Sequence, residues 1–339
     1  MITGRCIYLL FKKLSVALIV IASIILQPIQ VFAAEVIIGG QSIGIELNYE
    51  GVMITGTYDI FIDGEKYNPQ DDGYKIGDFV VQVNDKQINS ISSLTQLLQE
   101  NIENNQTIFV TLKRNTHFLK KELKLQKKND NFSTGLYVQD SLKGIGTLTY
   151  YDPSTQSFGA LGHVMNDIRV PKEFICQNGS IYYSYVNQIH PSKNGDPGEK
   201  IADIDTVSIG HIEENNNFGI FGKYQKLPTT YQMITTASMD EVEEGDAYFL
   251  TALNGNAPIQ CHIRITHLKK QSAPDIKGIT FEIVDSEVLS QTNGIIQGMS
   301  GSPIIQNGKL VGCVTHVNVN NVREGYGLYI DWMLENDKK

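Results

Sequence analysis

The stretch GMSGSPII, residues 298–305, places a serine in a Gly-x-Ser-Gly turn directly before an apolar run. Asn307-Gly308 follows, and this dipeptide between two apolar runs is a strong signal for a two-residue β-hairpin turn. A serine with glycines close on both sides meets no steric obstacle, so a tight turn can present its Oγ. The N–H groups of Gly298 and Ser300 can then converge on one point, as an oxyanion hole requires. The stretch therefore predicts a turn that presents a nucleophile at the start of a β-hairpin.

The chain around this turn is strand-like and rich in glycine turns. From residue 134 onward, short apolar runs recur at intervals of roughly ten to thirty residues, a spacing typical of an antiparallel sandwich or a pair of barrels. The G-x-S-x-G elbow of the α/β-hydrolases is not met, because Ser302 stands where its last glycine belongs. Residues 129–339 are therefore expected to form a mainly β domain. Its predicted strands include 146–151, 180–186, 206–212, 248–252, 260–266 and 279–284.

A nucleophilic serine needs a base, and His163 is the strongest candidate among the seven histidines. It follows a glycine at the end of the apolar run 158–161, where a side chain can project into a cleft. His316 lies in the strand after the serine hairpin, where it can be a residue on a sheet face. Spacing alone leaves a structural role open for His163 as well.

Residues 35–128 carry a mixed pattern and are expected to form a small α+β domain. Leucines between residues 94 and 98 recur at helical spacing, and residues 107–114 alternate as a strand does. This succession resembles a PDZ domain. The resemblance implies that Ser42, Ile43, Gly44 and Ile45 form the loop whose N–H groups hold the terminal carboxylate of a peptide. The alternative is a spacer that binds nothing.

Charge and the first 34 residues bear on the compartment. Lys+Arg 28 against Asp+Glu 37 gives a net charge of −9 with no long basic run, which argues against nucleic acid as a partner. Residues 1–34 combine basic residues, an uncharged apolar run over 14–26, and a Val31-x-Ala33 site. This order predicts a secretory signal peptide cleaved after Ala33, with an uncleaved membrane anchor as the alternative. In both cases the bulk of the chain is expected to be exported.

The four cysteines do not form a recognisable framework. Cys6, Cys176, Cys261 and Cys313 include no C-x-x-C pair, and an odd three remain once the leader is set aside. A disulfide framework and a zinc knuckle are therefore not supported. Cys313 lies in the apolar run 310–317 and is expected to be a buried small hydrophobe rather than a nucleophile.

Longer motifs carry a resemblance over nearly the whole exported chain. The chain resembles the stage IV sporulation protein B peptidase family, whose order of leader, PDZ domain and serine peptidase domain it shares. The resemblance implies a chymotrypsin-like two-barrel β serine peptidase domain over residues 129–339, after the PDZ-like domain. The matching motifs are STGLYVQDS at 133–141, GALGH at 159–163, PGEK at 197–200, GIFG at 219–222, GIIQGMSGSPII at 294–305 and VTHV at 314–317.

The same resemblance implies a serine endopeptidase and assigns roles to three residues. Ser300 would be the nucleophile, His163 the base, and Asp285 the acid that orients the base. From position alone, Asp167, Asp203 and Asp205 compete with Asp285, because a triad is assembled from different strands. No metal or organic cofactor is implied.

The resemblance also implies a biological role. The protein substrate would be the extracytoplasmic part of a regulator of an intramembrane protease, cut during sporulation in the space between forespore and mother cell. The enzyme would also cleave itself, and its PDZ-like domain would bind a peptide or mediate self-association. Two other functions stay open, namely an extracytoplasmic quality-control PDZ protease and an inactive PDZ adaptor.

Overall fold

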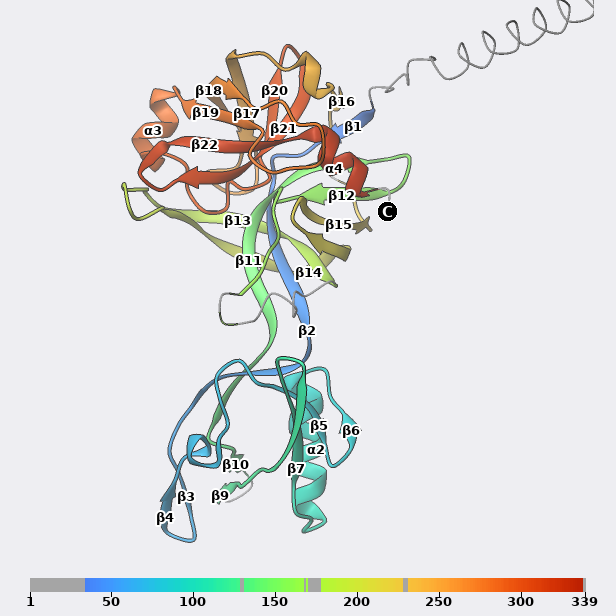
Figure 1. The fold of residues 1–339 in the computed structure, drawn as a ribbon, viewed down its shortest axis with the longest axis vertical. Helices are drawn as coiled ribbons and strands as arrows, with labels where there is room; N and C mark the ends of the chain where they lie inside the picture. The colour runs from blue at the N-terminus through green and yellow to red at the C-terminus, as the bar shows by residue number, and fades with distance from the viewer. Residues whose placement is uncertain (1–33, 129–130, 168, 170–177, 228–230, 338–339) are drawn as a thin grey trace, which may run out of the picture. The chain divides into compact units, whose positions relative to one another are not determined.

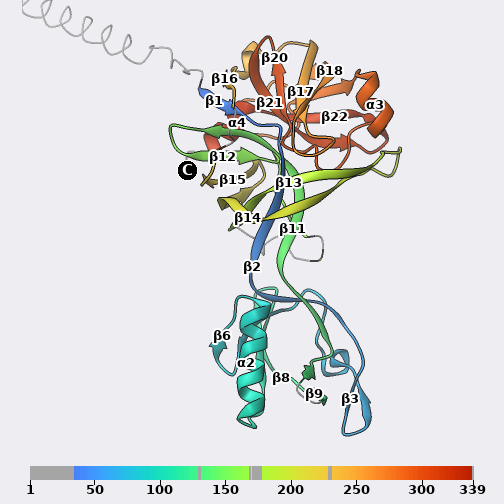
Figure 2. The same cartoon turned by 180° about the vertical axis from the view of Figure 1, so that it is seen from behind.

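The computed structural model describes residues 34–128, 131–167, 169, 178–227 and 231–337, and the predicted leader lies outside them except for Ala34. Strands dominate these residues, which confirms the mainly β class predicted from the sequence (Figures 1 and 2). None of the helices in this part of the chain has the length and apolar character needed to cross a membrane.

The C-terminal half of the described chain forms a closed barrel of six strands. Residues along these strands alternate between the core and the solvent, as in β18, where Cys261, Ile263 and Ile265 are buried between exposed neighbours. Asn307 and Gly308 both have positive φ, 51° and 75°, as a two-residue hairpin turn of type I′ requires. The predicted hairpin is therefore present as β20–β21. In barrel order the strands are β17 (Gly245–Thr251), β18 (Ile259–Leu268), β19 (Ile279–Ile283), β22 (Asn321–Tyr329), β21 (Lys309–Asn318) and β20 (Pro303–Gln306).

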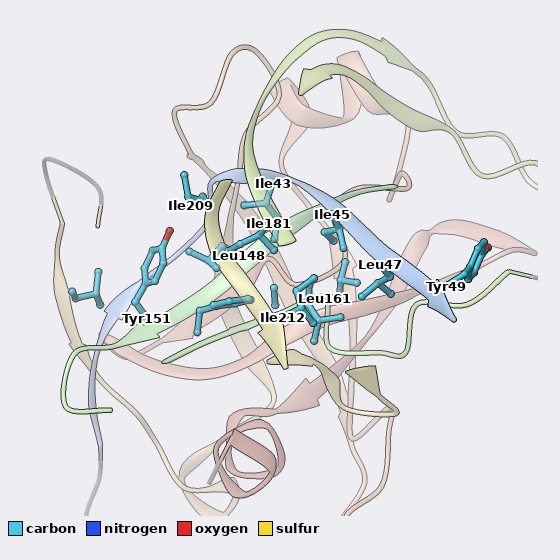
Figure 3. Packing of buried hydrophobic residues seen from close by; sticks show 14 of the residues in the cluster. Ile43, Ile45, Leu47, Tyr49, Leu148, Tyr151, Leu161, Ile181, Ile209 and Ile212 are labelled. Carbon is cyan, nitrogen blue, oxygen red and sulfur yellow. The ribbon is translucent and has the colours of Figure 1, made fainter. Parts of the chain in front are cut away.

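A second ring of six strands precedes it in the chain, and we call it the first barrel. Each strand pairs with the next around the ring, and β11 pairs with β2 to close it. Its core includes Ile45, Leu148 and Ile181, all buried (Figure 3). With the C-terminal barrel, this ring confirms the predicted two-barrel β architecture. In ring order the strands are β2 (Ser42–Thr57), β11 (Leu136–Asp152), β12 (Ser157–Ala160), β15 (Gly219–Tyr224), β14 (Glu199–Asn216) and β13 (Gly179–His190).

Four further elements extend the barrels. Strand β1 (Glu35–Ile38) pairs with β11 on one side and with β16 (Met233–Thr235) on the other. Helix α3 (Ser286–Thr292) follows β19, and α4 (Ile330–Asp337) follows β22. Helix α4 contacts both barrels, since Asp337 accepts hydrogen bonds from Tyr150 and Ser157 while Trp332 donates to Gln271.

A small subdomain, residues 49–140, is inserted between β2 and β11. Its own core lies between a sheet and the amphipathic helix α2, whose leucines Leu94, Leu97 and Leu98 are buried as their spacing predicts. The helix starts at a capping box in which the Ser90 Oγ accepts the Ser93 N–H. Its elements are β3 (Ile60–Ile62), β4 (Glu65–Tyr67), β5 (Phe79–Val83), β6 (Lys86–Gln87), α2 (Ile91–Glu103), β7 (Phe109–Arg114), β8 (His117–Glu122), β9 (Gln126–Lys128) and β10 (Asn131–Ser133).

The small subdomain starts at residue 49, whereas the sequence predicted a small domain that starts at residue 35. Ser42, Ile43, Gly44 and Ile45 lie inside β2, where β11 pairs with one edge of the strand and β13 with the other. A Cβ on Gly44 would lie 2.5 Å from Cγ2 of Ile204, so this glycine permits close packing. The prediction that these four residues form a carboxylate-binding loop is therefore wrong. The pattern misled because β2 is one strand of 16 residues whose first half belongs to the first barrel and whose second half belongs to the small subdomain.

The insertion leads to a test of the first barrel. Asn48 pairs with Ser141, so replacing residues 49–140 with an Asn-Gly turn would join β2 and β11 as an ordinary hairpin. We expect this chain to keep a strand-rich circular dichroism spectrum and one cooperative unfolding transition. Deleting residues 36–126 removes all of β2 and nearly all of β1, which opens the ring, so we expect that chain not to fold. Equal stability of the two deletions would contradict this account.

Candidate active site

The serine turn, residues 297–302, is fixed to the first barrel through its carbonyl groups. Thr147 Oγ1 donates to the carbonyl of Gly298 at 2.7 Å, and the Thr147 N–H donates to that of Ser300 at 2.9 Å. Thr149 Oγ1 donates to the carbonyl of Gly301 at 2.8 Å. Both threonines belong to β11, so one strand of the first barrel holds the turn that precedes β20 of the C-terminal barrel.

Glycine is required in this turn because the two barrels approach closely. A Cβ on Gly301 would lie 2.0 Å from the Thr147 carbonyl oxygen and 2.5 Å from the Leu161 nitrogen. Gly301 and Gly298 also have φ of +91° and +92°, a region that residues with side chains rarely adopt. The glycines of the motif therefore serve both the conformation of the turn and its contact with β11.

Two N–H groups of the turn remain as donors. Among the described residues, neither the N–H of Gly298 nor that of Ser300 has an acceptor. The N–H groups of Met299, Gly301 and Ser302 do have acceptors in the main chain. Nearly all buried N–H groups in proteins are paired, so two unpaired donors beside one serine can bind an oxygen atom.

The two serines of the turn differ in their surroundings. Ser300 Oγ donates to the carbonyl of Thr315 at 2.9 Å and is half-buried. Ser302 is fully buried, and its Oγ has no hydrogen-bond partner among the described residues. Only Ser300 is placed to react.

A strained turn carries His163 to the same place. After β12, Leu161 and Gly162 both adopt left-handed backbone, with φ of 67° and 68°. Gly162 lies against the C-terminal barrel, since a Cβ there would be 2.9 Å from Cγ2 of Thr315. Thr315 thus contacts the residue before His163 through its side chain and binds Ser300 Oγ through its carbonyl. In the structure, the loop of the predicted base and the predicted nucleophile therefore both contact Thr315.

The hydrogen bond of His163 defines its tautomer. Its Nδ1 lies 2.8 Å from the carbonyl oxygen of Val164. A carbonyl can only accept, so Nδ1 carries the proton and Nε2 carries a lone pair. Burial lowers the pKa of His163 below its ordinary value, although the bond to Val164 opposes this. The imidazole is therefore a neutral base near pH 7.

His316 is a second histidine in the site. Its ring centroid lies 5.3 Å from that of His163. Burial, with smaller effects of His163 and Lys277, lowers the pKa of His316 to about 4. Its Nδ1 is buried and has no hydrogen-bond partner among the described residues. His316 is thus a neutral neighbour of the base, which the sequence had placed only on a sheet face.

Asp285 does not reach His163. Its carboxylate is the N-cap of α3, where it accepts the N–H groups of Glu287 and Val288 at 3.1 Å, and it also accepts the N–H of His262 at 3.2 Å. Burial alone would raise the pKa of Asp285, but these three donors outweigh it and hold the pKa below its usual value. The prediction that Asp285 orients the base is therefore wrong. A β-strand that ends in aspartate before a helix is as good a capping signal as a catalytic one.

The competing aspartates are also occupied elsewhere. Asp167 forms an ion pair with Arg169 and accepts a hydrogen bond from Tyr49. Asp205 accepts the N–H of Thr206, and Asp203 is exposed on β14. Among the described residues, the partner of His163 Nδ1 is a main-chain carbonyl and not a carboxylate.

Sequence reasoning missed the significance of Lys200, the last residue of the PGEK motif. Its side chain is 4% exposed, and Nζ donates to Thr251 Oγ1 at 2.8 Å. Burial lowers the pKa of Lys200 to about 7. Its N–H donates to Gln297, and its methylenes pack where a Cβ of Gly298 would stand. Lys200 therefore supports the serine turn through its backbone N–H and its methylenes.

Comparison with known proteins gives one family. A family model described as SpoIVB peptidase S55 matches residues 130–334. No curated protein sequence matches the chain.

Cys313, which the sequence predicts to be a buried hydrophobe, is fully buried, as is Cys261, and both are free thiols.

Two solved structures are similar to the chain. The active form of the Rv3671c protease from M. tuberculosis is 17% identical, with a TM-score of 0.32, and the match covers 59% of this chain and 73% of that one. The inactive form of the Rv3671c protease is 18% identical, with a TM-score of 0.30, and the match covers 56% of this chain and 81% of that one.

The buried lysine predicts an alkaline dependence of stability. Lys200 has a pKa of about 7 in the folded chain but close to 10.4 when unfolded, so the unfolded state binds one more proton between these values. The free energy of unfolding should therefore rise with pH from about 7 to 10. Lys200→Met should lack this rise and be more stable near pH 7 by a few kcal/mol.

Urea unfolding at pH 7, 8 and 9 measures this difference against the wild type. Lys223→Met is the matched control, because Lys223 is an exposed lysine of β15. It should leave the pH dependence unchanged. A Lys200→Met chain that is less stable than wild type at pH 7, with the same slope, would refute the assignment.

Proposed function

Because the chain belongs to the SpoIVB peptidase S55 family and is a serine peptidase, we propose that Ser300 is its nucleophile and His163 its general base. The observation that carries this proposal is the hydrogen bond from His163 Nδ1 to Val164. This bond leaves the lone pair on Nε2. The loop that carries His163 contacts Thr315, which also binds Ser300 Oγ. A serine acquires nucleophilic reactivity only when such a base takes its proton.

Attack on a peptide carbonyl would use these groups in sequence. Ser300 Oγ bonds to the carbonyl carbon while its proton passes to His163 Nε2, and the carbonyl oxygen becomes an oxyanion. The N–H groups of Gly298 and Ser300 would receive that oxyanion, since both lack acceptors within the described chain. His163 then returns the proton to the leaving amine, and water repeats the cycle on the acyl-enzyme. All protons and electron pairs are accounted for without a metal or an organic cofactor.

In the proposed mechanism, the hydrogen bond of Ser300 to Thr315 would be a resting arrangement. The Ser300 hydroxyl proton is engaged by the Thr315 carbonyl rather than by His163. Rotation about the Cα–Cβ bond would exchange one hydrogen bond for another, which costs little free energy. Thr315 thus holds the hydroxyl near the base until a substrate enters.

We propose the biological substrate on the basis of family membership and the leader. The chain would be exported or anchored outside the cytoplasmic membrane, and it would cut the extracytoplasmic part of a regulator of an intramembrane protease, as well as itself, during sporulation. A quality-control protease is the alternative. To distinguish them, the rate of digestion of unfolded casein is compared with that of a defined membrane-protein loop. A quality-control protease should digest both, whereas a protease of narrow specificity should cut only the loop.

A second proposal concerns peptide recognition by the small subdomain, in keeping with its resemblance to a PDZ domain. A pocket lies between α2 and residues 132–138, with apolar walls that include Leu94, Leu98 and Leu136. Over Leu136–Gln139, β11 pairs with β2, and no described strand pairs with its other edge. An open strand edge beside an apolar pocket suits an extended apolar peptide, which adds as a strand and inserts one side chain.

The first test concerns Ser300. Ser300→Ala should abolish labelling by a fluorophosphonate probe and reduce peptide hydrolysis by several orders of magnitude, since a nucleophile is lost. Ser302→Ala is the matched control in the same turn. It removes a buried hydroxyl that has no hydrogen-bond partner within the described chain, so it should keep activity and should not lower the melting temperature. Equal losses in both variants would refute the assignment of Ser300.

The second test concerns the groove. Thr95 is exposed on α2 and lines the pocket, so Thr95→Arg should block a peptide without disturbing the core. We expect slower cleavage of a protein substrate and unchanged cleavage of a short peptide. Gln96→Arg, at the next exposed position of α2 but outside the pocket, should change neither rate. If Thr95→Arg behaves like Gln96→Arg, the groove has no role in recognition.

A further inference from the structure

An asparagine side chain clamps the loop that carries His163. Asn215 lies at the end of β14 and is 2% exposed. Its Oδ1 accepts the N–H of Met165 at 2.9 Å, and its Nδ2 donates to the carbonyl of Met165 at 2.8 Å. Asn215 therefore fixes two consecutive peptide groups, directly after the histidine.

The first of these peptide groups is the one that orients the base. The N–H of Met165 and the carbonyl of Val164 belong to the same planar unit, so fixing one fixes the other. The Val164 carbonyl accepts the hydrogen bond from His163 Nδ1, with the two atoms 2.8 Å apart. A row of hydrogen bonds thus runs from the Asn215 amide through one peptide group to the imidazole. Because hydrogen bonds in a row polarise one another, the bond to Asn215 makes the carbonyl a stronger acceptor.

We propose that Asn215 is a positioning residue for His163, acting through the peptide group between Val164 and Met165. It would hold the imidazole in the tautomer and orientation that direct Nε2 to Ser300, the task that a carboxylate performs in a Ser-His-Asp triad. This inference rests on the proposed role of His163 as the base.

The chemistry of the side chain fits this role. The loop presents both an N–H and a carbonyl, and an amide can pair with both at once, whereas a carboxylate can only accept. Strand β15 lies between β14 and β12, and its residue Ile220 pairs with Asn215 on one side and with Ala160 on the other. His163 comes three residues after Ala160, the last residue of β12, so the amide of Asn215 and the His163 loop come from two strands on either side of β15.

The experiment measures how fast a fluorophosphonate labels Ser300 in the full chain, corrected for the folded fraction, across pH. Asn215→Leu removes both hydrogen bonds and should slow labelling about 100-fold, the loss expected when a catalytic group is misplaced by an ångström. Asn215→Asp keeps the acceptor for Met165 and should stay within about tenfold of wild type. The labelling rate falls at acid pH as the imidazole is protonated, and we call this fall the acid limb. Asn215→Asp should also move the acid limb to higher pH, because a nearby negative charge stabilises the imidazolium.

Asn216→Asp is the matched control, since it makes the same chemical change one residue along. In the part of the chain that the structure describes, the Asn216 side chain bonds within its own turn, to Glu214 and to the N–H of Phe218. It should alter neither the labelling rate nor the acid limb. Two other groups can affect the pH of the acid limb. His316 faces His163, and Lys277 contributes to lowering the pKa of His316.

Three outcomes would overturn the proposal. The first is labelling of folded Asn215→Leu at the wild-type rate. The second is an equal loss in both Asn215 variants with an unmoved acid limb, which would show a structural role only. The third needs no substitution: if the Met165 amide of the wild type exchanges with solvent as fast as exposed amides, the clamp does not exist in solution. Failure of wild-type Ser300 to label would instead refute the proposed function.

Discussion

The site depends on Thr147, which holds both of its halves from a single position of β11. Its N–H and Oγ1 bind the carbonyls of Ser300 and Gly298, and its own carbonyl accepts the N–H of Leu161 at the start of the His163 loop. The serine turn belongs to the C-terminal barrel and the histidine loop to the first. Because one residue bonds to both, their separation is set by main-chain geometry, and two carbonyls of the turn are engaged by Thr147.

The imidazole of His163 is hydrogen-bonded to a neutral group, and this sets the electrostatics of the site. A carboxylate beside His163 would stabilise the imidazolium and raise the pKa, whereas the Val164 carbonyl offers only a dipole. Burial therefore dominates, and His163 and His316 are both kept neutral. In the proposed mechanism, the positive character needed for an oxyanion would come instead from the N–H groups of Gly298 and Ser300, which have no acceptor among the described residues. A site of this kind gains stability by avoiding a buried charge and relies on hydrogen-bond geometry to position the base.

The sequence predicted what depends on local pattern. The alternating strands, the Asn307-Gly308 hairpin, the leucine face of α2 and the serine turn follow from periodicity and turn chemistry. It did not predict what depends on long-range contacts. Residues 42–45 read equally well as a loop because their two pairing partners are about a hundred residues away or more, and Asp285 suits a helix cap as well as a triad. Asn215 gave no signal, since an asparagine before a turn is ordinary until its partner across the sheet is known.

The insertion of the small subdomain has a consequence for how the parts of the chain communicate. No flexible linker joins it to the first barrel, because β2 and β11 run through both and pair along their length (Figures 1 and 2). The open edge over Leu136–Gln139 and the residue that fixes the serine turn, Thr147, therefore belong to one strand. The pairing of that strand shifts register between Tyr137 and Val138 and again between Gln139 and Ser141. Such bulges are where a strand bends and twists. The first shift lies within the open edge and the second between that edge and Thr147, so a peptide that added to the edge would act on a strand with a defined bend on the way to the serine turn.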